Sequence, residues 1–397
     1  MHRHDLVRGW VLAGSLALAV SPASAKNPQY VSRARIGAAL GATPMARGDA
    51  ARSAISAEAL PPRLALQAER RVVGGIATGM LSDGRGRLII APLTPSLVQL
   101  SPRGDVEWTR SLGDSPAVVQ PVLTSDGTRV VLTATNQVFG FDPSGRLKFK
   151  RQLEAGFGVS ADLLPLVDGS VVIALGNRVL RLSSSGQLQD SANTGSKVLS
   201  LLATQGLGSA HDGVLALTSS GALLRWRTPH PPRRIANLSG VPKGAVLAGR
   251  HLLVILEGNR LVDVDLPTLT QHTRWRLSGA EVLDSPIALP GGDTLSWTTD
   301  GLLLRHTRAG AEMLRVSLEP GVSGPSPVTQ SPVLADKNGR FAFSRAGVGL
   351  GIVEPDGALH FVEGASCDVP VSLIDAGGGR FALGCRSGVL WLLKAQD

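Results

Sequence analysis

Short apolar segments alternate with polar turns along most of the chain. Between residues 115 and 153 the β-prone segments are 117–123, 129–135, 138–141 and 146–153. Ser125-Asp126-Gly127 predicts a turn after the first segment, because Gly tolerates positive φ and Asp hydrogen-bonds its own backbone. Four antiparallel strands in about 40 residues are typical of one propeller blade. One blade cannot bury both of its faces, so neighbouring blades must cover them.

The same plan recurs along the chain, and a short turn marks the step from the first to the second strand of each unit. These turns are Asp83-Gly84, Asp126-Gly127, Asp168-Gly169, Asp212-Gly213, Gly249-Arg250, Gly291-Gly292, Asn338-Gly339 and Gly378-Gly379. The apolar segment after most of them is nearly continuous, as expected for a strand covered on both faces. We count eight units and predict an all-β fold, an eight-bladed β-propeller of four-stranded antiparallel blades, with seven blades as the alternative.

A second series of turns leads into the outermost strand of five units. Each turn ends in a glycine: Gly104, Gly145, Gly186, Gly310 and Gly357. Four positions later stand Trp108, Phe149, Asp190, Leu314 and Phe361, respectively. A large ring at this position can fill the joint between adjacent blades. The alternative is that these aromatic residues are ordinary strand residues.

The eighth unit begins near residue 368 and provides only three strand segments, the last being Val389–Leu393. A ring with such an unpaired edge would be prone to pair with other chains. We therefore predict that Arg63–Val72 supplies the fourth strand and closes the ring. The expected organisation is a signal peptide at 1–25, a flexible leader at 26–60, and a β-propeller at 61–397 closed by an N-terminal strand.

Residues 1–25 have the pattern of a secretory signal peptide. Arg3 and Arg8 form a basic start, Trp10–Val20 is apolar but too short to span a bilayer, and Ala23-Ser24-Ala25 fits a cleavage site. No Cys follows that site, so a lipid anchor is not indicated, and we expect no transmembrane segment in the mature chain. The protein is predicted to be periplasmic or secreted.

Composition narrows the class of partner. The 397 residues include 47 Gly and 25 Pro and carry a formal net charge of +9. Because the Arg residues are spread along the chain, we expect a solvated basic surface and no nucleic-acid binding. Such a surface attracts acidic partners or membrane surfaces. We expect a monomer that binds a protein or a cell-envelope component.

The two cysteines, Cys367 and Cys385, flank a predicted hairpin formed by 369–375 and 380–383. Both fall at its open end, in a chain expected to be exported, where disulfides persist. We predict a disulfide between them. Two free thiols or metal ligation are the alternatives, and no paired His supports metal binding.

Candidate partner-binding residues gather on both sides of Thr228-Pro229-His230-Pro231-Pro232. They are Arg225, Trp226, Arg227, Arg233 and Arg234. Four guanidinium groups beside a stiff turn suit contact with a protein or an anion. The alternative is a solvated turn between the third and fourth strands.

The other polar residues do not form a recognisable reaction centre. The histidines outside the signal peptide are scattered, and each is expected in a turn or on a strand surface. Asp263 and Asp265 share one face of a predicted strand, an arrangement that is common at strand ends. We predict no catalytic residue, no metal ligand and no cofactor.

Several stretches carry a family resemblance: Asp284–Ala288, Leu295–Trp297 and Leu302–His306 in one unit, and Gln330–Leu334 with Phe341–Phe343 in the next. Over roughly residues 75–397 the chain resembles the pyrroloquinoline-quinone-like β-propeller repeat family. In one branch, the quinoprotein dehydrogenases, the funnel binds quinone and Ca²⁺, typically with adjacent paired cysteines and a catalytic Asp. The other branch resembles the non-catalytic periplasmic propeller of the outer-membrane β-barrel assembly machinery.

The length, the expected export and the eight units fit the second branch. The two cysteines stand eighteen positions apart, unlike the adjacent paired cysteines of the dehydrogenase branch. The resemblance therefore implies an exported, non-catalytic scaffold that binds through its rim and funnel loops. The alternatives are a quinone- and Ca²⁺-dependent oxidoreductase and a sugar-binding propeller.

Overall fold

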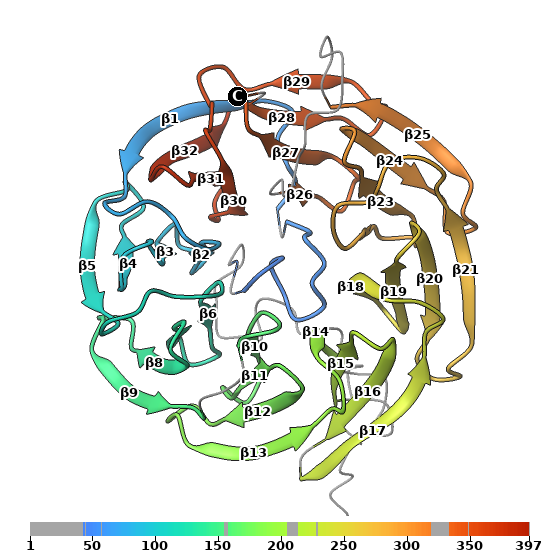
Figure 1. The fold of residues 1–397 in the computed structure, drawn as a ribbon. Coiled ribbons are helices and arrows are strands. Elements are labelled where there is room, and N and C mark those ends of the chain that lie inside the picture. The colour runs from blue at the N-terminus through green and yellow to red at the C-terminus, as the bar shows by residue number, and fades with distance from the viewer. Residues whose placement is uncertain are drawn as a thin grey trace, which may run out of the picture.

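The computed structural model describes residues 43, 45–56, 58–154, 158–204, 213–227, 229–318, 333–347 and 349–396. In this part of the chain, 32 strands form eight four-stranded antiparallel sheets. The sheets stand around a common centre as the blades of a propeller, and each sheet runs from an inner strand to an outer one (Figure 1). The predicted eight-bladed all-β fold is confirmed.

Blades 1 to 4 each use four consecutive strands. Blade 1 contains β2 (Leu81–Ser82), β3 (Leu88–Ile90), β4 (Ser96–Leu100) and β5 (Val106–Ser111). Blade 2 contains β6 (Val122–Leu123), β7 (Arg129–Leu132), β8 (Gln137–Phe141) and β9 (Leu147–Gln152). Blade 3 contains β10 (Leu164–Pro165), β11 (Val171–Leu175), β12 (Arg178–Leu182) and β13 (Leu188–Asn193). Blade 4 contains β14 (Val198–Thr204), β15 (Gly213–Thr218), β16 (Ala222–Arg227) and β17 (His230–Asn237).

Blades 5 to 7 follow the same order, and blade 8 joins the two ends of the described chain. Blade 5 contains β18 (Pro242–Ala248), β19 (His251–Leu256), β20 (Arg260–Asp265) and β21 (Gln271–Arg276). Blade 6 contains β22 (Ile287–Ala288), β23 (Thr294–Trp297), β24 (Leu302–His306) and β25 (Glu312–Ser317). Blade 7 contains β26 (Val333–Ala335), β27 (Phe341–Arg345), β28 (Gly349–Val353) and β29 (Leu359–Phe361). Blade 8 contains β30 (Pro370–Asp375), β31 (Arg380–Cys385), β32 (Val389–Ala395) and β1 (Leu64–Arg71).

Burial follows strand position within a blade. Every residue of β11 is buried, whereas the outer strand β9 alternates between exposed and half-buried positions. Blades on both sides cover the second strand of a sheet, while the outer strand faces solvent along one edge. The continuous apolar segments of the sequence are therefore the strands that pack between two neighbouring blades.

The ring closes by pairing the first strand with the last. β1 lies antiparallel to β32, with Leu64 opposite Ala395 and Arg71 opposite Val389. In Figure 1 the blue strand β1 forms the outer edge of the red blade. The structure thus confirms that residues within 63–72 supply the missing strand.

Large side chains fill the joints between several blades. The Trp108 ring packs against Gly145 of the next blade, where a Cβ would come within 2.8 Å of the indole. Phe149 packs against Gly186 in the same way, and Leu314 against Gly357. Phe361 differs, because its ring is 42% exposed and contacts Phe343 of its own blade edge-on.

The residues before β1 divide into two parts. The predicted signal peptide, 1–25, and the first part of the predicted leader lie outside the described residues. Residues 45–56 lie in the centre of the ring (Figure 1). Small side chains such as Ala50 and Ala54 are buried there against the blades. Across the described ranges, we find no helix with the length and apolarity needed to cross a membrane.

Candidate functional site

The predicted partner-binding residues lie on the β16–β17 hairpin of blade 4. Arg225, Trp226 and Arg227 belong to β16, and Arg225 pairs with Arg233 of β17. Trp226 is only 2% exposed and packs in the apolar core beneath the hairpin. Because side chains alternate along a strand, the burial of Trp226 turns its two Arg neighbours toward the other face. Trp226 is therefore a core residue, which differs from its predicted place in a contact surface.

The exposed charge of this hairpin comes from its outer strand. Arg233 and Arg234 are exposed on β17, whereas Arg225 and Arg227 are half-buried. Pro231 lies within β17, which is possible because an edge strand has one row of N–H groups that no neighbouring strand needs. The structure thus brings two of the four predicted guanidinium groups to a solvent-facing edge.

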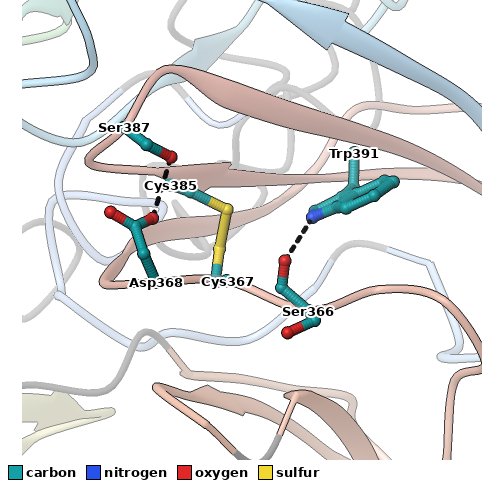
Figure 2. Close-up of a disulfide and its surroundings, with 6 residues drawn as sticks. All are labelled: Ser366, Cys367, Asp368, Cys385, Ser387 and Trp391. Atoms are coloured by element: carbon teal, nitrogen blue, oxygen red, sulfur yellow. Dashed lines mark hydrogen bonds between the residues drawn. A yellow bond between two sulfur atoms is a disulfide. The ribbon is translucent and has the colours of Figure 1, made fainter.

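The two cysteines form the predicted disulfide. The Cys367–Cys385 bond joins the segment that enters blade 8 to the end of β31, with a Cα–Cα distance of 5.5 Å (Figure 2). Two hydrogen bonds surround it: the Trp391 indole donates to the Ser366 carbonyl at 3.1 Å, and the Ser387 hydroxyl to Asp368 at 2.9 Å. Both cysteines are buried. The covalent link therefore lies in the blade where the ring closes.

The two carboxylates on β20 have separate partners. Asp263 is 1% exposed. Its Oδ2 accepts a hydrogen bond from Arg274 Nε at 2.8 Å, and its Oδ1 is hydrogen-bonded to His251 Nδ1 at 2.9 Å. Asp265 pairs with Arg250, whose hydrogen bond holds the pKa of Asp265 below its usual value. The Arg274 guanidinium also donates to the Gly292 carbonyl of blade 6. This cluster fastens blade 5 to blade 6.

His306 lies in the same joint and is buried, which differs from its predicted place in a turn or on a strand surface. It is 3% exposed and stacks on Trp275, with 4.8 Å between ring centroids. Burial lowers the pKa of His306, because the charged imidazolium would lose its water. Among the described residues, its Nδ1 atom has no hydrogen-bond partner.

The inner strands surround a central channel, and part of the chain itself crosses it. We call residues 43–60, as far as they are described, the inner segment. Its backbone hydrogen-bonds to four blades: Thr43 to Ser82, Ala50 to Ala203, Ala51 to Leu247, and Ala54 to Ala335. These hydrogen bonds are 2.9 to 3.1 Å long. The inner segment therefore hydrogen-bonds to the inner edges of the blades at single points, while its own backbone turns so that the Ala54 amide donates to the Arg47 carbonyl at 2.9 Å.

Two arginines fasten the inner segment to different parts of the wall. Arg47 donates to Asp284 Oδ2 at 2.8 Å and to the Ser285 carbonyl at 3.0 Å. Arg52 donates to Asp162 Oδ2 and to the Leu201 carbonyl, both at 2.8 Å. The two Arg side chains are 13% and 5% exposed, respectively. Charge-assisted bonds of this kind are stronger than neutral ones, and here they join residues far apart in sequence.

A cavity remains beside the inner segment. Its volume is about 650 Å³, and its lining comes from the first strands of the blades together with Arg47 and Arg52. Acidic and basic groups both face this space, among them Asp162, Asp284 and Lys243. Over the described ranges, no cluster of three or more His, Cys, Asp or Glu side chains is placed to hold a metal ion.

Sequence reasoning missed the inner segment. It has no sustained hydrophobic period, and its polar contacts reach residues more than 100 positions away. The pair Arg47 and Arg52 was the available signal, but their acidic partners stand alone in distant units. Only the ring brings them together.

Comparison with known proteins now decides the family. The family model described as outer membrane protein assembly factor BamB matches residues 49–276, more than half of the chain. The chain belongs to this BamB family. The match begins within the inner segment and extends through blade 5. A search of curated proteins finds no match.

Two solved structures with a TM-score of 0.50 or more have a similar fold at low sequence identity. The computationally designed Ika8 protein is 13% identical, with a TM-score of 0.63, covering 82% of this chain and 98% of its own. A virginiamycin B lyase from Staphylococcus aureus with quinupristin is 13% identical, with a TM-score of 0.50 and coverage of 84% and 100%. BamB from Moraxella catarrhalis is 14% identical, with a TM-score of 0.43 and coverage of 83% and 99%.

Proposed function

We propose that this protein is an exported, non-catalytic scaffold that binds a protein or another cell-envelope component at the rim of the ring. Membership of the BamB family carries the proposal, because that family is named for outer-membrane protein assembly. The buried disulfide fits an oxidising compartment such as the periplasm. A rigid ring also suits this role, since it holds variable loops in fixed positions.

The most suitable contact on the rim is the exposed edge of blade 4. Arg233 and Arg234 stand on an outer strand whose free backbone edge also faces solvent. Arg recognises carboxylates through two parallel hydrogen bonds, so this edge suits an acidic surface of a partner protein. We therefore propose Arg233 and Arg234, with the half-buried Arg225 and Arg227 behind them, as the basic partner-binding surface.

The test is affinity purification from the native host after mild cross-linking, with mass spectrometry of the recovered proteins. Arg233→Glu with Arg234→Glu should lower recovery of the main envelope partner about tenfold, as expected for the loss of charged hydrogen bonds. Arg103→Glu with Arg276→Glu is the matched control, because it changes the net charge equally at exposed positions elsewhere. Equal recovery with both double variants would reject the blade 4 surface. Failure to recover any envelope component would reject the scaffold function itself.

A further inference from the structure

The inner segment has the features of a bound peptide more than those of a core strand. Arg47, Arg52 and Ala54 have φ angles of 58°, 56° and 52°, the left-handed region that residues other than Gly rarely adopt. Such conformations persist where the surroundings hold them. Here the surroundings include hydrogen bonds within the segment, from the Ala54 amide to the Arg47 carbonyl at 2.9 Å and from Arg47 Nε to the Arg52 carbonyl at 3.1 Å, as well as the contacts with the channel wall.

The wall of the channel offers binding groups at several positions along the segment. Asp284 and Asp162 receive Arg47 and Arg52, as described above. The Arg47 guanidinium also lies over the Trp297 ring, 5.8 Å from its centroid, an arrangement that attracts a cation. Further along, the fully buried Asp375 accepts a hydrogen bond from the Ser56 hydroxyl at 2.6 Å.

The inner segment is not part of any blade. All eight sheets are complete without it, since β1 begins at Leu64 and supplies the strand that blade 8 needs. The residues between the inner segment and β1 include the exposed Pro62 and Arg63. The ring and its occupant are therefore joined by a short connection at the surface. The cavity of about 650 Å³ beside the segment shows that it does not fill the channel.

We propose that the central channel is a peptide-binding site and that the inner segment is its ligand within the same chain. The partner that fits is a short segment of another exported protein that can form the same turn, with two arginines five positions apart. The acidic groups of the wall select the arginines. The blades accept small side chains at positions such as Ala50 and Ala54 and a large apolar side chain near each end, as at Met45 and Leu60. This site goes beyond the proposed rim surface and uses none of its residues.

The test uses the full chain with a protease recognition sequence inserted between Pro61 and Pro62. Cleavage of the folded protein frees the inner segment covalently and leaves the eight sheets intact. A fluorescent synthetic peptide of residues 43–60 is then added, and binding is followed by anisotropy and gel filtration. We expect no binding to the uncleaved protein and saturable exchange into the cleaved protein.

Competing peptides identify the recognition groups. A peptide with Arg47→Glu and Arg52→Glu should compete about thirtyfold less well or worse, as expected for the loss of paired charges in a closed site. A peptide with Ala59→Ser, changed at an exposed position, should compete like the native sequence. Asp162→Asn with Asp284→Asn in the cleaved protein should weaken the native peptide, and both side chains are exposed enough for the fold to tolerate the change.

Two results would overturn the proposal. One is that the cleaved segment stays in place and does not exchange with excess peptide. The other is that its departure abolishes the cooperative melting of the ring, which would make it an element of the core. Arg233→Glu with Arg234→Glu should leave peptide exchange unchanged, so the peptide site and the rim surface can fail separately.

Discussion

Removing the disulfide gives the sharpest test of how blade 8 holds the ring together. The change is Cys367→Ala with Cys385→Ala, and the comparison is the native protein with and without a reducing agent. The bond spans a sequence separation of 18 residues. In the chain-entropy model, closing a loop of this length restricts the unfolded chain by about 3 kcal/mol. Breaking the bond should therefore lower the free energy of unfolding by about that amount.

The effect on thermal melting follows from the size of the ring. Unfolding releases about 2.1 cal/mol/K per residue, or roughly 0.7 kcal/mol/K for a ring of about 330 residues. A loss of about 3 kcal/mol then lowers Tm by about 4 °C. Reduction removes only the link, whereas the Ala variant also removes two buried sulfur atoms. The variant should therefore melt slightly below the reduced native protein.

Differential scanning calorimetry and urea unfolding measure both quantities, and mass spectrometry verifies the oxidised state at the start. Reducing agent should shift the native protein and leave the double Ala variant unchanged, which controls for other effects of the reagent. A difference in Tm below about 1 °C between oxidised native protein and variant would refute the reasoning. It would show that the ring unfolds without separating the two ends of this loop.

Three further predictions concern closure, joints and pH. Deletion of residues 61–73 removes β1 and should cause aggregation in light scattering or loss of a cooperative transition, whereas unchanged melting would reject the closing role of Leu64–Arg71. Gly145→Ala should cost about 2–4 kcal/mol in urea unfolding, because it adds a clash with Trp108 to an unfavourable φ of 81°. Gly195→Ala is the control: Gly195 has a similar φ of 75° but open space around it, so the change should cost about 1 kcal/mol. Equal costs for the two variants would contradict the packing of Trp108 against Gly145. Because the pKa of His306 is lowered in the folded protein, the unfolded chain binds a proton at a higher pH than the folded chain does, so the free energy of unfolding falls as pH drops below about 6.5. His306→Phe should flatten the dependence of that free energy on pH between pH 7.5 and 5.5. An unchanged slope would contradict burial of His306 as its cause.

The blades could be predicted because their signals are local. In the turn after β6, Gly127 has a φ of 77°, and Asp126 accepts a hydrogen bond from the Thr128 amide at 3.1 Å. Burial opposes ionisation of Asp126, but hydrogen bonds from Lys148 and its neighbours outweigh it and leave its pKa well below the usual value. Each of these interactions joins residues of the same blade. Turn chemistry of this kind is visible in the sequence and recurs in several blades.

The candidate site could be predicted only in part. The sequence predicts Arg233 and Arg234 beside a stiff turn, and the structure places both on the outer strand β17. Trp226 is grouped with them because of its charged neighbours, although the alternation of a strand turns it the other way. The apolar segment Leu223–Leu224 already begins the buried face that Trp226 continues. Applying the two-residue period there would have assigned Trp226 to the core.

The inner segment could not be predicted because its contacts depend on the finished ring. Arg52 finds its acceptors in blades 3 and 4, and Arg47 finds its own just before blade 6. Nothing local to residues 43–60 specifies those partners. Long-range pairs of single charges carry no periodic signal, so only the assembled architecture shows them.

The pairing of β1 with β32 sets the order in which this molecule can be completed. Leu64 lies opposite Ala395, so the two sides of this sheet are synthesised 331 residues apart (395 minus 64). Seven blades use strands that are consecutive along the chain and can form one after another. The eighth must wait until β32 has been released. A chain interrupted before Val389 would leave β1 without its neighbour, so closure of the ring depends on synthesis through β32.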